Sequence, residues 1–162
     1  MALVTARGIR LASHDDATPA HVDEAVADGG VIAEFPTTAA SAKAAHEKGL
    51  AVLMGAPNVV RGSSHSGNIS ACDVAGDGHL DILSSDYVPA RLLLAAFALP
   101  EKVPTLTLPQ AIGFVSLRPA AAAGLDDRGV IELTKRADLV QISLRSGVPV
   151  VRRVWREGIR VL

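Results

Sequence analysis

The stretch MGAPNVVRGSSHSGN, residues 54–68, has the composition of a polyphosphate-binding loop. It follows the apolar run GLAVL, which is typical of a buried strand, so its polar groups should lie just past a strand end. Its glycines let backbone N–H groups approach an anion, and its arginine offers a planar fork suited to phosphate. The expected substrate-binding residues are Asn58, Arg61, Ser63, Ser64 and Asn68, whereas His65, taken alone, fits a surface loop histidine, a metal ligand or a general acid. The pattern is not Gly-x-x-x-x-Gly-Lys-Ser/Thr, so it does not predict a P-loop nucleotide hydrolase.

Two other apolar runs end in groups that can bind a metal or a proton. His14 follows GIRLAS, and Asp86 follows LDILSS. In α/β enzymes the carboxyl ends of parallel strands carry the chemistry. Taken alone, His14 fits a metal ligand and a helix-entry histidine about equally, and Asp86 fits a catalytic carboxylate or the N-cap of the next helix.

Strands alternate with helices over the region that must position these groups. The expected strands are GIRLAS, VIAEF, LAVLM and LDILSS, and each leads into a helical segment. Thr18 and Pro19 mark one helix start, and Gly29 or Gly30 its end. Four such units predict an α/β fold with a parallel sheet, either doubly wound or part of a (β/α)8 barrel.

The alternation of strands and helices ends near Pro104. LTLPQAIGFVSLRPAAAAGL predicts two short helices, the second opened by Pro119 and closed at Gly124. GVIEL, ADLVQISL and VPVVRRVWREGIRVL alternate like antiparallel strands. We therefore expect two parts, an α/β region over 1–125 and a small β segment over 126–162 that is too small to stand alone.

Composition narrows the class of protein. The chain has 162 residues, of which 49% are hydrophobic, enough for a core, and 16 basic side chains balance 17 acidic ones. This balance favours neither nucleic acid nor an anionic membrane as a partner. Cys72 is the single cysteine, and the N-terminal residues lack the apolar core of a signal peptide, so a cytoplasmic protein without a membrane span is expected.

The C-terminal motifs resemble the amidohydrolase superfamily, in which the chain leaves a metal-bearing barrel and returns to a β-sandwich. PAAAAGLDDRGVIELTKRADLVQISL and VRRVWREGIRV carry the likeness, although Thr134 stands where the turn of the family usually has glycine. LASHDD, AEFPTT, MGAPNVVRGSSHSGN and DILSSDYVP, in this order, resemble the diphosphatases of that superfamily that act in the carbon–phosphorus lyase pathway.

This resemblance implies metal-dependent hydrolysis of α-D-ribose 1-methylphosphonate 5-triphosphate to the 5-phosphate and diphosphate. A divalent ion, zinc or manganese, would be bound by His14 and Asp86, and its hydroxide would attack. Asp86 would be the base, His65 would bind substrate or act as an acid, and Arg61 would neutralise the phosphates. The alternatives are another amidohydrolase, of deacetylase or deaminase type, or a non-catalytic half-barrel that binds phosphate.

The resemblance also implies a C-terminal half-barrel, the last four of eight strand–helix units. The His-x-His pair and the metal-bridging lysine or acid of the superfamily are absent from this sequence. The chain alone is therefore expected to be inactive, and an N-terminal half or self-association would complete the barrel. Phe35 or Pro36 occupies the place of a second strand-end histidine, and the neighbouring Glu34 fits a ligand and a non-ligand role equally.

Overall fold

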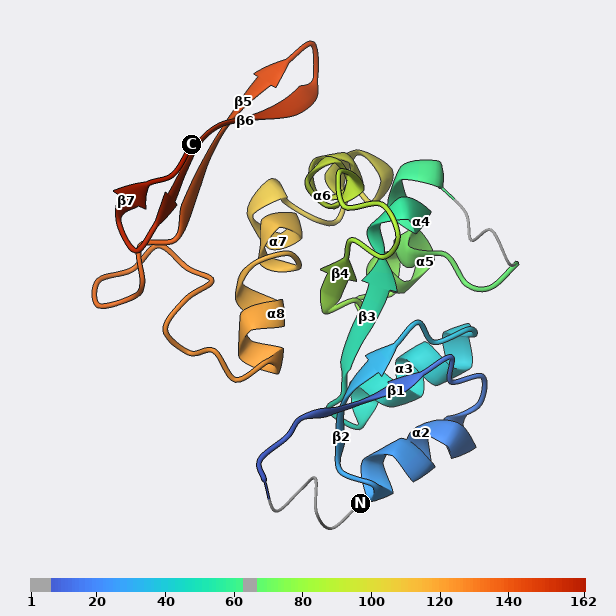
Figure 1. The fold of residues 1–162 in the computed structure, drawn as a ribbon. Coiled ribbons are helices and arrows are strands. Elements are labelled where there is room, and N and C mark those ends of the chain that lie inside the picture. Colours follow the sequence, from blue (N-terminus) through green and yellow to red (C-terminus); the bar gives the residue numbers. More distant parts are fainter. Residues whose placement is uncertain (1–6, 63–66) are drawn as a thin grey trace.

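The computed structural model describes residues 7–62 and 67–162, and a parallel sheet forms their centre (Figure 1). Its strands are β1 (Leu11–His14), β2 (Gly30–Glu34), β3 (Ala51–Gly55) and β4 (Ile82–Ser84). They lie side by side in the order β1-β2-β3-β4, and every pairing is parallel. A doubly wound sheet reverses its strand order, and the described strands show no such reversal. The carboxyl ends of all four strands therefore meet at one edge.

Helices alternate with these strands as the sequence predicts. They are α2 (Pro19–Ala27), α3 (Ala39–Glu47), α4 (Ala56–Arg61), α5 (Ala71–Gly76) and α6 (Arg91–Lys102). The Thr18 side chain accepts a hydrogen bond from the His21 backbone N–H at the start of α2, and Thr38 forms a capping box with Ser41 at the start of α3.

Helix α4 corrects the sequence-based expectation of one continuous polar loop over 54–68. The first half of that stretch is helical, with Pro57 in the first turn and Gly62 ending the helix at φ 86°. Proline is well tolerated in a first turn, and glycine adopts the left-handed conformation that ends a helix, so both residues fit a short helix as well as a loop.

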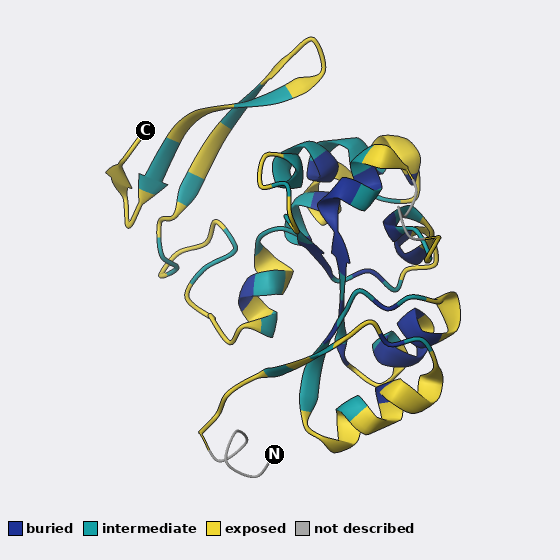
Figure 2. Ribbon diagram, turned by 45° about the vertical axis from the view of Figure 1, so that its right-hand side comes forward, coloured by how far each residue is buried: buried dark blue, intermediate teal, exposed yellow. Residues whose placement is uncertain are grey.

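The two faces of the sheet differ in burial. Ser13 pairs with Ala33 and Ala33 with Val52, and the side chains of this row lie on the face that holds the hydrophobic core. His14 pairs with Glu34 and Glu34 with Leu53 on the opposite face. There His14 is exposed, and Glu34 and Leu53 are only half-buried. Figure 2 shows the buried residues gathered along the centre of the sheet and on its adjoining helices.

Asp81 joins several elements at the amino end of β4. Its carboxylate accepts hydrogen bonds from the Val52 backbone N–H at 3.0 Å and from Arg118 Nη1 at 2.6 Å. His46 Nδ1 lies 3.3 Å from the same carboxylate. These contacts stabilise the packing of β3, β4 and the helices around them.

Two short helices follow, α7 (Leu108–Gly113) and α8 (Leu117–Ala122). The Leu83 backbone N–H donates to the Phe114 carbonyl at 2.9 Å, so the turn between α7 and α8 binds the outer edge of β4. Helix α8 begins before Pro119, which lies in its first turn rather than at its start. No helix in the described part of the chain is long and apolar enough to cross a membrane.

The C-terminal segment forms a separate antiparallel sheet of β5 (Leu139–Arg145), β6 (Val148–Arg156) and β7 (Ile159–Arg160). GVIEL is not a strand, which corrects the prediction: Ile131 and Leu133 are each 90% exposed. Its alternating pattern found no partner among the described strands, and an unpaired strand is not stable in water. No residue beyond Ala120 is buried, so this sheet has no core of its own.

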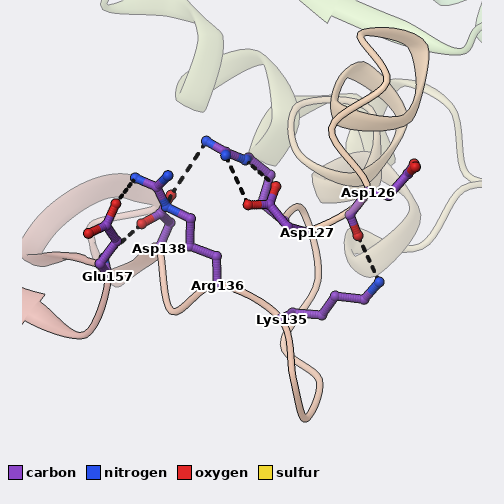
Figure 3. Close-up of polar contacts among 7 residues, drawn as sticks. Asp126, Asp127, Lys135, Arg136, Asp138 and Glu157 are labelled. Carbon is purple, nitrogen blue, oxygen red and sulfur yellow. Dashed lines mark hydrogen bonds and ion pairs between the residues drawn. The ribbon is translucent and has the colours of Figure 1, made fainter.

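Ion pairs connect the segment after α8 to the turn between β6 and β7 (Figure 3). Arg128 Nε donates to Asp127 Oδ1 at 2.7 Å, and Arg136 lies between Asp138, at 2.8 Å, and Glu157, at 2.9 Å. The hydrogen bond from Arg128 lowers the pKa of Asp127, and the backbone N–H of Glu157 lowers the pKa of Asp138. These contacts orient the small sheet without burying apolar surface.

Candidate functional site

A pocket of about 550 Å³ opens at the carboxyl ends of the parallel strands. It is lined by residues that follow β1, β2 and β3, by helix α4 and by the loop after β4. The sequence-predicted residues His14, Asn58, Arg61, Asn68 and Asp86 all line it. The parallel sheet therefore brings together residues that are more than seventy positions apart in the chain.

His14 is the last residue of β1, and its imidazole is oriented by two neighbours. Its Nδ1 lies 3.0 Å from Asp15 Oδ2, and its ring meets the Phe35 ring edge-on, with centroids 5.4 Å apart. A carboxylate on one ring nitrogen fixes the tautomer and directs the other nitrogen, as ligating or acid–base histidines require. The helix-entry interpretation of His14 is not supported, because α2 begins at Pro19 with Thr18 as N-cap.

Asp16 has a structural role in the fold. It is buried, its Oδ2 accepts a hydrogen bond from the Ser13 hydroxyl at 2.5 Å, and its backbone carbonyl accepts from Ser41 Oγ at 2.7 Å. Asp15, with its carboxylate beside His14, is therefore the acidic neighbour that contacts the pocket.

Asp86 lies above the end of β3. A Cβ added to Gly55 would be 3.2 Å from Asp86 Oδ2 and 3.7 Å from the Phe35 ring, so the missing side chain of Gly55 provides the space for the carboxylate. Helix α6 begins at Arg91 with Ala90 as N-cap, so the N-cap interpretation of Asp86 is wrong.

Three pocket residues after strands have left-handed backbone conformations. Asp15 has φ 60°, Phe35 has φ 54° and Asp86 has φ 51°. Such values are uncommon for non-glycine residues, and for a bulky residue such as Phe35 they indicate strain that the surrounding fold must hold in place. The left-handed conformation thus recurs at three neighbouring strand ends around the pocket.

Arg61 ends helix α4 and reaches the loop that follows Asp86. Its Nη2 donates a hydrogen bond to the Tyr87 hydroxyl at 3.1 Å, and both side chains line the pocket. Sequence reasoning missed Tyr87, for which adjacency to Asp86 was the one available signal. Asn58 has a structural contact too, because its Oδ1 accepts from the Ala71 backbone N–H at 2.9 Å and connects α4 to α5.

Ser63, Ser64 and His65 lie outside the described residues, so their predicted roles stay predictions.

The donors in the described part of the chain do not make a complete metal site. No group of three or more His, Cys, Asp or Glu residues there could hold an ion. A catalytic zinc site ordinarily has three protein ligands, whereas the sequence predicted two, His14 and Asp86. Glu34 lies beside His14 in the sheet register and does not line the pocket.

Solved structures place this fold with the amidohydrolases. An amidohydrolase from Thermotoga maritima MSB8 matches with a TM-score of 0.73 at 21% identity, covering 96% of this chain and 44% of that one. An adenosine deaminase from Xanthomonas campestris with bound zinc matches with a TM-score of 0.68 at 18% identity, covering 99% of this chain and 47% of that one. Identities this low establish the fold, not the reaction.

Sequence comparison is more specific. The chain is 55% identical over 161 residues to the α-D-ribose 1-methylphosphonate 5-triphosphate diphosphatase of Escherichia coli (strain K12). The match covers 99% of this chain and 43% of that enzyme, so the chain spans less than half of its relative's length. No family model matches. The resemblance to these diphosphatases, known as PhnM, is thereby confirmed, and the chain aligns with one part of such an enzyme.

Proposed function

We propose that this chain forms the substrate-binding part of a diphosphatase. The reaction is hydrolysis of α-D-ribose 1-methylphosphonate 5-triphosphate to the 5-phosphate and diphosphate, in phosphonate catabolism. The 55% identity to the Escherichia coli diphosphatase carries this proposal. The strand-end pocket supports it, because a carboxylate, an imidazole and a guanidinium line the same space.

Each pocket residue has a role in the proposed reaction that its side-chain chemistry suggests. The Arg61 guanidinium neutralises negative charge on the phosphate oxygens, which is how most phosphoryl-transfer enzymes lower the barrier. The Asp86 carboxylate accepts a proton from the attacking water. His14, beside the Asp15 carboxylate, lines the same pocket as Asp86.

The proposal includes a divalent ion, zinc or manganese, with His14 and Asp86 among its ligands; one protein of similar fold, the adenosine deaminase, holds zinc. These two residues do not complete a site in the described chain, so at least one more protein ligand is required. The roles given above to Arg61 and Asp86 as binding group and proton acceptor do not depend on the identity of that ion.

The chain also requires further protein to complete its fold. We propose that residues 1–125 are four units of a (β/α)8 barrel and that residues 126–162 belong to a β-sandwich. The sheet face that carries His14 and Leu53 supports the first part, because His14 is exposed and Leu53 is only half-buried. The paired apolar residues of β5 and β6, such as Ile142 with Val151, support the second, because Val151 is 37% exposed. An N-terminal half or a second copy of the chain would cover these surfaces.

Complementation tests this proposal. The purified chain is assayed for diphosphate release from the ribosyl triphosphate with zinc or manganese, alone and together with the part of the Escherichia coli enzyme that it does not cover. We expect activity from the complemented assembly alone, and its loss in Arg61→Gln and Asp86→Asn. An assembly that cleaves an amide or deaminates a base instead would establish another amidohydrolase activity, and an assembly without any activity would leave a phosphate-binding module.

A further inference from the structure

A hydrogen bond between Arg61 and Tyr87 connects two segments that line the pocket, the end of α4 and the loop after β4. Arg61 is the last residue of α4, whereas Tyr87 directly follows Asp86 in the loop after β4. At the pocket, Arg61 Nη2 donates a hydrogen bond to the Tyr87 oxygen at 3.1 Å. The group proposed to bind phosphate therefore contacts the residue that follows the proposed proton acceptor.

We propose that Tyr87 is a positioning residue that holds the Arg61 guanidinium toward the substrate phosphates, an inference that rests on the function proposed above. Arg61 is an exposed side chain at a helix end, and long exposed side chains lose much rotamer freedom when they bind a ligand. A phenol oxygen that accepts one N–H of the guanidinium restricts those rotamers before binding. The guanidinium keeps further N–H donors for a ligand in the pocket that both residues line.

The neighbouring backbone strengthens this arrangement. Asp86 has φ 51°, and its backbone N–H donates to Ser84 Oγ at 3.1 Å, so the loop that carries Tyr87 leaves β4 in a fixed direction. Tyr87 is 57% exposed, which places its ring at the mouth of the pocket rather than in the core. Tyr87 therefore contributes to the lining of the pocket more than to the hydrophobic core.

Lys102 provides a matched control. Its Nζ donates to the Val60 carbonyl at 3.5 Å, so it lies at the same end of α4 as Arg61, but it does not line the pocket. Lys102→Gln and Arg61→Gln each remove one positive charge from this end of the helix. A purely electrostatic contribution would make the two variants equivalent.

Calorimetric titration of the chain with inorganic tripolyphosphate tests the proposal. Tyr87→Phe keeps the ring and removes the oxygen, and we expect it to weaken binding about three- to tenfold, the range of one modest hydrogen bond. Arg61→Gln should weaken binding more, Lys102→Gln little, and Tyr87→Phe should add nothing in the Arg61→Gln background. In the complemented enzyme Tyr87→Phe should raise KM and leave kcat within about twofold.

Different results overturn different statements. If Tyr87→Phe binds tripolyphosphate as the unchanged chain does, or weakens binding equally with and without Arg61, Tyr87 does not position the guanidinium. If the unchanged chain binds no tripolyphosphate, the phosphate-binding function fails, and side-chain 15N relaxation of Arg61 still decides the positioning role. Greater mobility of the guanidinium in Tyr87→Phe is the expected result, and unchanged mobility refutes it.

Discussion

Replacing Thr134 with glycine should stabilise the C-terminal sheet. Thr134 has φ 72°, a conformation in which an L-residue is disfavoured by about 1–2 kcal/mol, and its branched Cβ makes it a poor occupant of this region. The side chain is exposed, so its removal leaves no cavity. Glycine would recover the strain but add unfolded-state freedom of about 0.5–1 kcal/mol. The net expectation is a gain of up to about 1.5 kcal/mol.

The single tryptophan makes this gain measurable. Trp155 lies in β6, so its fluorescence during urea unfolding reports on the sheet to which the turn leads. The midpoint should rise for Thr134→Gly without a change in slope, because the strain lies in the folded state. Thr134→Ala is the matched control, since it removes the branch but keeps a Cβ at the same backbone angle.

The difference in stability between Thr134→Gly and Thr134→Ala tests whether backbone strain at residue 134 matters. Thr134→Ala should stay closer to the unchanged chain than Thr134→Gly does. If Thr134→Gly is no more stable than Thr134→Ala, backbone strain at this turn is not the determinant, and the fit of glycine to this turn has no energetic basis here.

Three further changes probe the site, the fold and the acid response. Gly55→Ala should displace the Asp86 carboxylate, because the new Cβ would lie 3.2 Å from Oδ2; diphosphate release by the complemented enzyme should fall about tenfold or more at nearly unchanged stability. Asp81→Ala should cost about 2 kcal/mol in urea unfolding, because it removes the acceptor of the Val52 N–H and of Arg118; a cost near zero would contradict this. Because the folded chain lowers the pKa values of Asp127 and Asp138, their ionised carboxylates stabilise the fold at pH values above the ordinary carboxyl pKa, near 3.8. This stabilisation is lost as the pH falls through the lowered pKa values. Tryptophan fluorescence should therefore report acid loosening of the C-terminal sheet, and its persistence in Asp127→Asn/Asp138→Asn would contradict this cause.

Local signals predicted most of the helix starts and strand positions. Thr18 followed by Pro19 marks the start of α2, and apolar runs mark all four parallel strands, because caps and burial patterns act over a few residues. The same local rules failed for GVIEL and for α4. A strand needs a partner that the sequence does not name, and a six-residue helix with polar residues resembles a loop.

The site shows the same division. Strand ends predicted His14 and Asp86 as neighbours of the pocket, since parallel strands end at one edge. Tyr87 was not predicted, because its role depends on where the end of α4 meets the loop after β4. Gly55 likewise follows from the position of Asp86 above it, a contact between residues on adjacent strands.

The sequence by itself determined the chemical groups, the order of the strand–helix units and the likeness to diphosphatases, because residue type, periodicity and motif order are properties of the linear chain. The tertiary structure alone decided that Asp15 rather than Asp16 contacts His14, and that a phenol holds Arg61. These choices depend on side-chain directions set by strand register and left-handed turns, which no short stretch of sequence specifies.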